Sequence, residues 1–183
     1  RLGAAFGATL PRGSTVIINR DPHLSPRMLK RGIISGLPSA GINVQDTRSV
    51  PIPVARYIAR KTGAVGGVHI RLSPYDARVV DIKFMDSRGL NLSKDTERSI
   101  ERVFFREDFR RVYLDEVGVI AYQPRVIETY TEAFLACLNV QAIQEAQFAI
   151  VVDYANAPTS LVLPGVLGRL GVKVVELNAA IDE

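Results

Sequence analysis

The feature that most constrains the fold is a regular alternation of β-branched apolar runs with stretches of helical periodicity. Strands are predicted over residues 14–19, 42–47 and 66–73, with one helix between each pair. The first helix is expected to begin with Ser25 as its N-cap, and the second covers residues 54–61. This β-α-β-α-β order predicts a mostly parallel sheet, with helices on both faces and ligands at the carboxyl edge of its strands.

Two further elements are predicted to complete this unit. Residues 78–86 read as a strand antiparallel to the third strand, because only a few residues separate the two. A charged, amphipathic surface helix is expected after its N-cap, Ser93. The predicted fold class is therefore α/β, with three α/β/α layers built on a mixed, mostly parallel sheet.

A second β-α-β unit is predicted from Pro124 onward. Its strands carry no turn signal that returns them to the first sheet, so we expect a first domain over residues 1–122 and the start of a second, similar domain over residues 123–183. Two strands make only a marginal core. We therefore expect this unit to lean on the first domain or on further chain, since the sequence looks like part of a longer protein.

Composition limits the cellular setting. The chain has 183 residues, 47% of them hydrophobic, which is enough to bury a core. Cys137 is the one cysteine, which excludes an intrachain disulfide and favours a reducing compartment, and its apolar neighbours predict burial within a helix. The sequence has neither an apolar run of about 18 residues nor a signal-peptide layout. A cytoplasmic protein without a membrane span is therefore expected.

The net charge of +4 conceals an asymmetry along the sequence. Residues 1–80 carry 12 basic and 3 acidic side chains, whereas the remainder carries 11 and 16. Most of the basic residues are arginines, whose planar guanidinium suits phosphate. We therefore expect the first half to attract anions, although an ordinary solvated surface remains the alternative for most of these arginines. Nucleic acid is disfavoured as a partner, because the sequence shows no aromatic ladder or RNA-binding signature.

The third predicted strand ends in residues that could carry chemistry. In GGVHIRLS the two-residue period places His69, Arg71 and Ser73 on one face. Pro74 and Tyr75 then turn the chain sharply, which leaves the Ser73 hydroxyl on an exposed corner. Two interpretations stay open from spacing alone: Ser73 takes part in chemistry, or it simply starts a Ser-Pro turn.

Cationic side chains are predicted near the same edge of the sheet. Arg20 and His23 lie in the loop after the first strand, and Lys83 lies across the turn from Ser73. Together with Arg71, these residues are the candidate phosphate-binding groups.

The run VIINRDPHLSPRMLKRGIISGLPSAGINVQDTRSVPIPVARYIARKTGAVGGVHI resembles the first domain of the α-D-phosphohexomutases, the phosphomannomutase and phosphoglucomutase family. An Arg-Asp loop, a Gly-Leu-x-x-x-Gly helix end and a Pro-x-Pro segment carry the resemblance. The later run VVDYANAPTSLVLPGVLGRLGVKVVELN resembles the start of the family's second domain. The chain most resembles the mutase-like half of bacterial proteins that fuse this half to a mannose-1-phosphate guanylyltransferase.

By this resemblance the family's catalytic loop TASHNP falls on RLSPYD, so Ser73 takes the place of the phosphorylated serine. Arg20 and Lys83 take the places of a phosphate-contacting arginine and of the lysine ten residues beyond the serine. We therefore expect their guanidinium and amine to converge with the Ser73 hydroxyl on one anion pocket at the sheet's rim. The family's histidine and asparagine after the serine are replaced by Pro74 and Tyr75, which removes polar groups that would orient a phosphoserine.

The acidic residues near Ser73 do not suggest a metal site. Asp76 and Asp81 flank it, but the nearby arginines make ion pairs more plausible than metal ligation. The sequence also departs from the family here, because Val80 and Asp81 replace the Asn-Gly that precedes the family's lysine. By resemblance the complete enzyme uses Mg²⁺ held by a DGDGDR loop, and this chain contains no such loop, so no metal-binding residue is predicted here.

Two functions follow from the resemblance. The first is a phosphosugar mutase domain that interconverts hexose 1-phosphate and 6-phosphate through a phosphoserine, and that is inactive as this fragment alone. The alternative is a non-catalytic phosphosugar-binding or structural module attached to a sugar-1-phosphate nucleotidyltransferase. The partners that the resemblance implies are a phosphosugar, further mutase domains and a fused nucleotidyltransferase domain.

Overall fold

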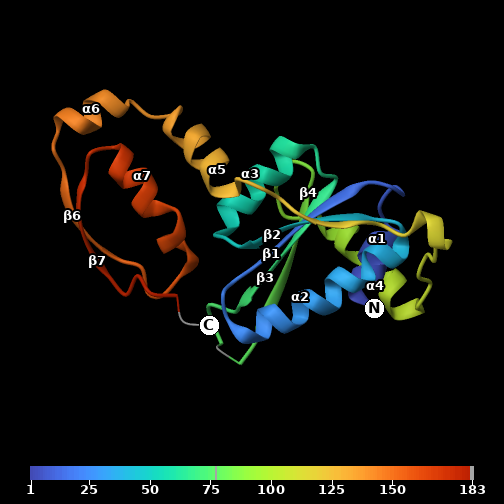
Figure 1. Ribbon diagram of the computed structural model, residues 1–183. Coiled ribbons are helices and arrows are strands. Elements are labelled where there is room, and N and C mark those ends of the chain that lie inside the picture. The colour runs from blue at the N-terminus through green and yellow to red at the C-terminus, as the bar shows by residue number, and fades with distance from the viewer. Residues whose placement is uncertain (77, 182–183) are drawn as a thin grey trace.

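Five strands form the main sheet, in the spatial order β4-β3-β1-β2-β5 (Figure 1). The computed structural model describes residues 1–76 and 78–181. Neighbouring strands run parallel except for β4, which is antiparallel to β3. The bounds are β1 (Thr15–Arg20), β2 (Asn43–Ser49), β3 (Gly66–Leu72), β4 (Val80–Asp86) and β5 (Ile120–Tyr122). The mixed, mostly parallel sheet predicted from the sequence is confirmed, and β5 adds a short strand at its edge.

Helices cover both faces of this sheet (Figure 1). Because side chains alternate along a strand, Val16 and Ile18 of β1 join the apolar cluster under one set of helices, whereas Ile17 joins the cluster on the opposite face. We call these two sides the α2 layer and the α3 layer. The α2 layer contains α1 (Leu2–Ala8), α2 (Leu24–Gly36) and α4 (Lys94–Arg106), and the α3 layer contains α3 (Ile52–Thr62) and α5 (Val126–Leu135).

A two-stranded parallel sheet, β6-β7, forms the second unit. Its apolar contacts with the first unit run through α5 and α7, which share a cluster with α3 that includes Val54, Leu135 and Val166. On the strands, Val151 and Val175 are 67% and 59% exposed, so part of this small sheet is uncovered. The elements are α6 (Val140–Glu145), β6 (Ala149–Asp153), α7 (Leu163–Arg169) and β7 (Lys173–Leu177), and short 3₁₀ turns cover Pro38–Ala40, Leu114–Glu116 and Pro158–Leu161.

Side chains cap the N-termini of α2 and α4, and the cap of α2 differs from the prediction. Ser93 caps α4 as predicted, since its Oγ accepts the N–H of Thr96 at 3.3 Å. Helix α2, however, begins at Leu24, and its N-cap is His23, whose Nδ1 accepts the N–H of Ser25 at 3.3 Å. The Ser25 cap was therefore wrong by two residues, because an imidazole nitrogen does here what a hydroxyl oxygen usually does.

The environment of Cys137 also differs from the prediction. Helix α5 ends at Leu135, which is the buried residue of this turn, and Cys137 follows on the exposed side with its thiol directed to the carbonyl of Ala133 at 3.4 Å. The apolar neighbours therefore did not bury it. Across the described residues, no helix combines the length and the apolar character that a membrane crossing requires.

Candidate functional site

Ser73 lies directly after β3, at the carboxyl edge of the parallel strands. Its backbone N–H donates to the carbonyl of Val79 at 2.8 Å, and its Oγ accepts the N–H of Tyr75 at 3.3 Å. The Tyr75 side chain is 94% exposed, so the chain turns in solvent here. The predicted exposed corner is thus present, and the Ser73 hydroxyl closes a local serine turn.

Two cationic side chains, Arg71 and Lys83, lie on the strand pair β3-β4 that leads to this corner. Arg71 and Asp81 are cross-strand partners of β3 and β4, and the Arg71 Nε and Nη2 donate to Asp81 Oδ2 at 3.3 and 3.2 Å. The Lys83 Nζ lies 3.9 Å from the same oxygen. A second expected pair joins Asp76 to Arg78 at 2.9 Å. Both flanking carboxylates are therefore ion-paired, as predicted, and Asp81 holds two cations that a phosphate on Ser73 would need.

A row of polar residues crosses the sheet at Lys83, and its two buried members are Asn19 and His69. His69 lies between Asn19 on β1 and Lys83 on β4, in register with both, and it is 2% exposed. Its Nε2 is 3.7 Å from Asp21 Oδ1. Burial, together with the charges of Arg71 and Arg56, lowers the pKa of His69 to about 4, so its imidazole is neutral at pH 7.

Two atoms of this row lack hydrogen bonds. Within the described part of the chain, neither Nδ1 of His69 nor Oδ1 of Asn19 has a partner, although the Asn19 Nδ2 donates to the carbonyl of Val50 at 2.9 Å. Burial raises the pKa of the neighbouring Asp21, while Arg71, the N–H of Leu72 and Arg20 act in the opposite direction. Sequence reasoning placed His69 on the correct face but did not assign it a role, because burial cannot be read from a two-residue period.

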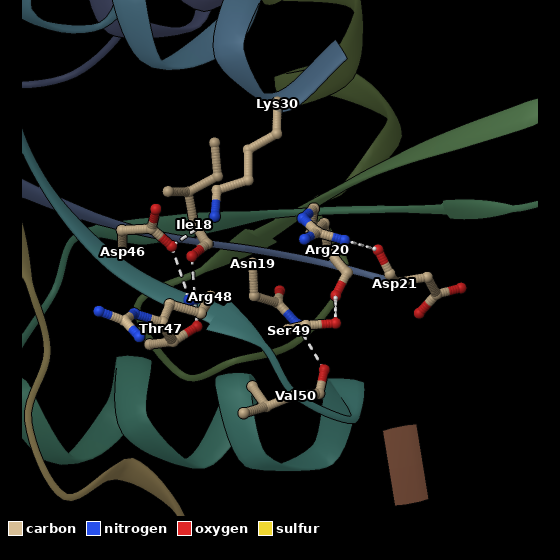
Figure 2. A network of polar contacts seen from close by, with 10 residues as sticks. All are labelled: Ile18, Asn19, Arg20, Asp21, Lys30, Asp46, Thr47, Arg48, Ser49 and Val50. Carbon is tan, nitrogen blue, oxygen red and sulfur yellow. Dashed lines mark hydrogen bonds and ion pairs between the residues drawn. The ribbon is translucent and has the colours of Figure 1, made fainter. Parts of the chain in front are cut away.

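Arg20, which the resemblance pairs with Lys83, lies on the other side of the sheet. It lines a cavity beside α2, whereas Asn19, one residue earlier, points to Val50, which lies between β2 and α3 (Figure 2). Lys83 shares its face with Met85, which packs against α3. The structure therefore does not bring Arg20 and Lys83 into the single pocket that we expected. Strand alternation is the physical reason, since it directs these two side chains into different layers.

The cavity beside α2 is strongly basic and has a volume of about 570 Å³. Lys30 reaches from α2 to Asp46 on β2, with 2.5 Å between Nζ and Oδ1 (Figure 2). Asp46 Oδ1 also accepts the backbone N–H of Arg48 at 2.6 Å. The charged residues that line this cavity are Arg20, Arg27, Lys30, Arg31, Asp46 and Arg48.

A metal centre does not emerge from these side chains. Over residues 1–76 and 78–181, no three histidine, cysteine, aspartate or glutamate side chains are grouped so that they could hold a metal ion. The residues present therefore do not fit the Mg²⁺ that the resemblance implies, and no chemical step is assigned to a metal here.

Comparison with known proteins gives a consistent picture. Residues 1–111 match the family described as "Phosphoglucomutase/phosphomannomutase, alpha/beta/alpha domain I". A phosphoglucomutase/phosphomannomutase of Thermococcus kodakarensis is 36% identical over 186 residues, covering 100% of this chain and 41% of the relative. A probable phosphoglucosamine mutase of Pyrococcus horikoshii is 33% identical, covering 98% and 38%. The chain thus spans about two fifths of the length of these curated relatives.

Solved structures agree on the fold. A putative phosphomannomutase from Thermus thermophilus superposes with a TM-score of 0.84 at 22% identity, covering 99% of this chain and 41% of that one. A phosphoglucomutase/phosphomannomutase family protein from Burkholderia thailandensis gives a TM-score of 0.82, also at 22% identity, covering 99% and 40%. The likeness extends across both units of the chain.

Proposed function

The chain belongs to the phosphoglucomutase/phosphomannomutase family, and from this premise we propose that it supplies domain I and the start of a second domain of a phosphosugar mutase. In this proposal the enzyme interconverts hexose 1-phosphate and hexose 6-phosphate through a phosphoserine at Ser73. The relatives extend well beyond the stretch that this chain matches. Further mutase domains, and an acidic loop for Mg²⁺, are therefore expected elsewhere in the full-length protein.

The observation that carries the proposal is the position of Ser73 at the carboxyl edge, on an exposed corner next to a strand pair with two cations. A phosphoserine carries close to two negative charges near neutral pH. Arg71 and Lys83 are the cations that would balance this charge, and Asp81 holds both of them when no phosphate is present. Phosphorylation is then expected to draw the two cations from Asp81 toward Ser73.

Arg20 and His23 are proposed as further phosphate-binding residues, with different support. The Arg20 charge acts on the carboxyl of Asp21, which also responds to Arg71, so Arg20 borders the same rim from the α2 layer. His23 is exposed, and its Nδ1 is used in the α2 cap, which leaves its Nε2 for a ligand.

Phosphopeptide mass spectrometry on the full-length protein tests the proposal. After incubation with glucose 1,6-bisphosphate or mannose 1,6-bisphosphate, the phosphate is expected on Ser73. The Ser73→Ala variant should lose both the phosphopeptide and mutase turnover, whereas Ser87→Ala, in the exposed turn after β4, should keep both. Phosphate-free Ser73 in a protein that still turns over substrate would refute the assignment.

The departures in the Ser73 loop favour a second candidate. Pro74 and Tyr75 offer no side-chain donor that is directed at Ser73, and Arg71 is engaged with Asp81. These features support a non-catalytic module that binds a phosphosugar or stabilises an attached sugar-1-phosphate nucleotidyltransferase. Here Ser73→Ala should leave every measured activity unchanged, whereas deletion of the module should alter assembly or nucleotidyltransferase kinetics. Unchanged assembly and kinetics after the deletion would refute this candidate.

A further inference from the structure

Two aspartates of β4 form ion pairs with arginines, and they differ in what else they contact. Asp86 accepts the backbone N–H groups of Arg88 and Leu90, both at 2.9 Å, so it fixes the turn after β4. Over the described residues, the Asp81 carboxylate accepts hydrogen bonds from the Arg71 side chain alone, at 3.2 and 3.3 Å. Asp81 therefore does not hold the backbone, and its role lies in the side chains that it engages.

The two cations at Asp81 are held loosely enough to be exchanged. Arg71 Nε and Nη2 share a single oxygen, Oδ2, and Lys83 Nζ approaches the same oxygen at 3.9 Å, which is longer than a hydrogen bond. The side chains of Arg71, Asp81 and Lys83 are 30%, 24% and 42% exposed, so solvent screens these contacts and their separation costs little. A second anion beside them can therefore take over either cation.

Ser73 is placed so that a phosphate on its hydroxyl would be this second anion. Its N–H donates to the carbonyl of Val79 at 2.8 Å, which extends the β3-β4 ladder by one pair beyond Leu72 and Val80. Asp81 lies opposite Arg71 in the same ladder. Because side chains alternate along a strand, Ser73 shares a face with this pair and lies diagonally across from the carboxylate.

We propose that Asp81 is a positioning residue that acts through Arg71 and Lys83 and keeps the phosphorylation of Ser73 readily reversible. The inference rests on the proposed function, in which the Oγ–P bond at Ser73 forms as an O–P bond of a hexose bisphosphate breaks. The serine proton passes to the sugar oxygen of the hexose monophosphate that leaves, so the phosphate arrives with its own charge.

The charges explain why the carboxylate matters. Two cations and one carboxylate sum to +1 before the transfer, and a phosphate of about −2 brings this group to about −1. Without the carboxylate the corresponding sums are +2 and about 0, which favours the phosphorylated state. Asp21 and Arg71 also attract each other, but Asp21 is present in both cases and does not alter the comparison. Asp81 thus brings the two states closer in free energy.

The phosphate occupancy of Ser73 in the full-length protein tests this inference. Mass spectrometry measures it at equilibrium with a fixed ratio of hexose 1,6-bisphosphate to hexose 6-phosphate, of glucose or of mannose. Asp81→Asn should raise the ratio of phosphorylated to unphosphorylated Ser73 by about three- to tenfold, the range for a partly exposed charge-assisted contact. Transfer from the phosphoserine to hexose 6-phosphate should slow by a similar factor in rapid-quench experiments.

Two further variants separate charge from structure. Asp81→Glu keeps the charge and should stay near the wild-type ratio. Asp86→Asn is the matched control, because it removes a carboxylate of similar exposure, 26%, from an arginine pair at the far end of β4, and it should leave the ratio unchanged. Equal ratios in the wild type and Asp81→Asn, or the same rise in either of these two variants, would overturn the inference and leave the phosphoserine in place.

Absence of phosphate on Ser73 in every variant would refute the proposed function instead, and a double-mutant cycle then decides the inference. Ser73→Glu places an anion at the same position without any transfer step. In urea unfolding, this substitution should be more favourable in the Asp81→Asn background than in the wild type, by about threefold in the equilibrium constant. Additive effects in the cycle would mean that the two anions do not compete for Arg71 and Lys83, and the inference would fail.

Discussion

Replacement of Arg48 by glycine and by alanine separates the energetic cost of its backbone conformation from the stabilisation that its side chain provides. At φ +62° the arginine adopts a conformation that costs an L-residue roughly 1–2 kcal/mol. Its stacking on Tyr122 returns about 0.5–1 kcal/mol, the range for an exposed cation–π contact. Alanine loses the stacking and keeps the strain, so Arg48→Ala should be less stable than the wild type by about 0.5–1 kcal/mol.

Glycine loses the same contact but also removes the strain. Against this gain stands the greater freedom of glycine in the unfolded chain, about 0.5–1 kcal/mol. Arg48→Gly is therefore expected to be more stable than Arg48→Ala by roughly 0.5–1 kcal/mol. The hydrogen bond from the backbone N–H of residue 48 to Asp46 is available to both variants, so it does not affect the comparison.

Urea unfolding of the full-length protein measures this difference, and Arg60 in α3 provides the control pair. There the order should be reversed, with glycine less stable than alanine by about 1 kcal/mol, because the backbone is helical. If Arg48→Gly proves less stable than Arg48→Ala, the left-handed conformation is not a source of strain.

Three further predictions address the buried polar groups and the edge strand. The pKa of His69 is depressed from 6.5 to about 4 in the folded state, so the unfolded chain binds more protons between these pH values, and the free energy of unfolding should fall as the pH drops through that window. In unfolding titrations, His69→Leu should remove this part of the pH dependence. Asp21, whose pKa is raised, acts in the opposite direction in both proteins. Asp46→Ala should destabilise the fold by about 3–5 kcal/mol because it leaves Lys30 buried without its carboxylate, and adding Lys30→Met should recover a large part of the loss in the same denaturation assay. Gly118→Ala should cost about 1–3 kcal/mol and speed amide exchange in β5, because a Cβ at this position would lie 2.0 Å from the carbonyl oxygen of Ile42.

The main sheet could be predicted because its strands follow a simple rule. β-branched runs separated by helical periodicity identify parallel strands, and the few residues between β3 and β4 require the antiparallel pair that the structure contains. Helix α1 was not predicted, because its sequence LGAAFGA carries neither a cap nor a polar face. It is held by close packing instead, since a Cβ at Gly3 would lie 2.3 Å from the carbonyl oxygen of Ile33 in α2.

The candidate site could be predicted only in part. The turn at Ser73 and the ion pairs of the flanking carboxylates follow from local sequence, and the structure contains both. The environment of His69 depends on packing from α3 and on charges from other elements, which no local pattern reports. The same limit explains Cys137, because helix α5 buries Leu135 but ends before the thiol.

The positive charge of the first half illustrates why counting residues is not enough. The excess is a sum over the sequence. Successive side chains of a β-strand point to opposite faces of the sheet, so the basic residues are divided between the two helix layers. Arg20 and the arginines of α2 fall on one side, around the cavity that Lys30 and Asp46 also line. Arg71 and Lys83 fall on the other, where Asp81 already engages both. A phosphate on Ser73 must therefore displace this carboxylate. Covalent attachment helps there, because it holds the phosphate beside those cations at high effective concentration.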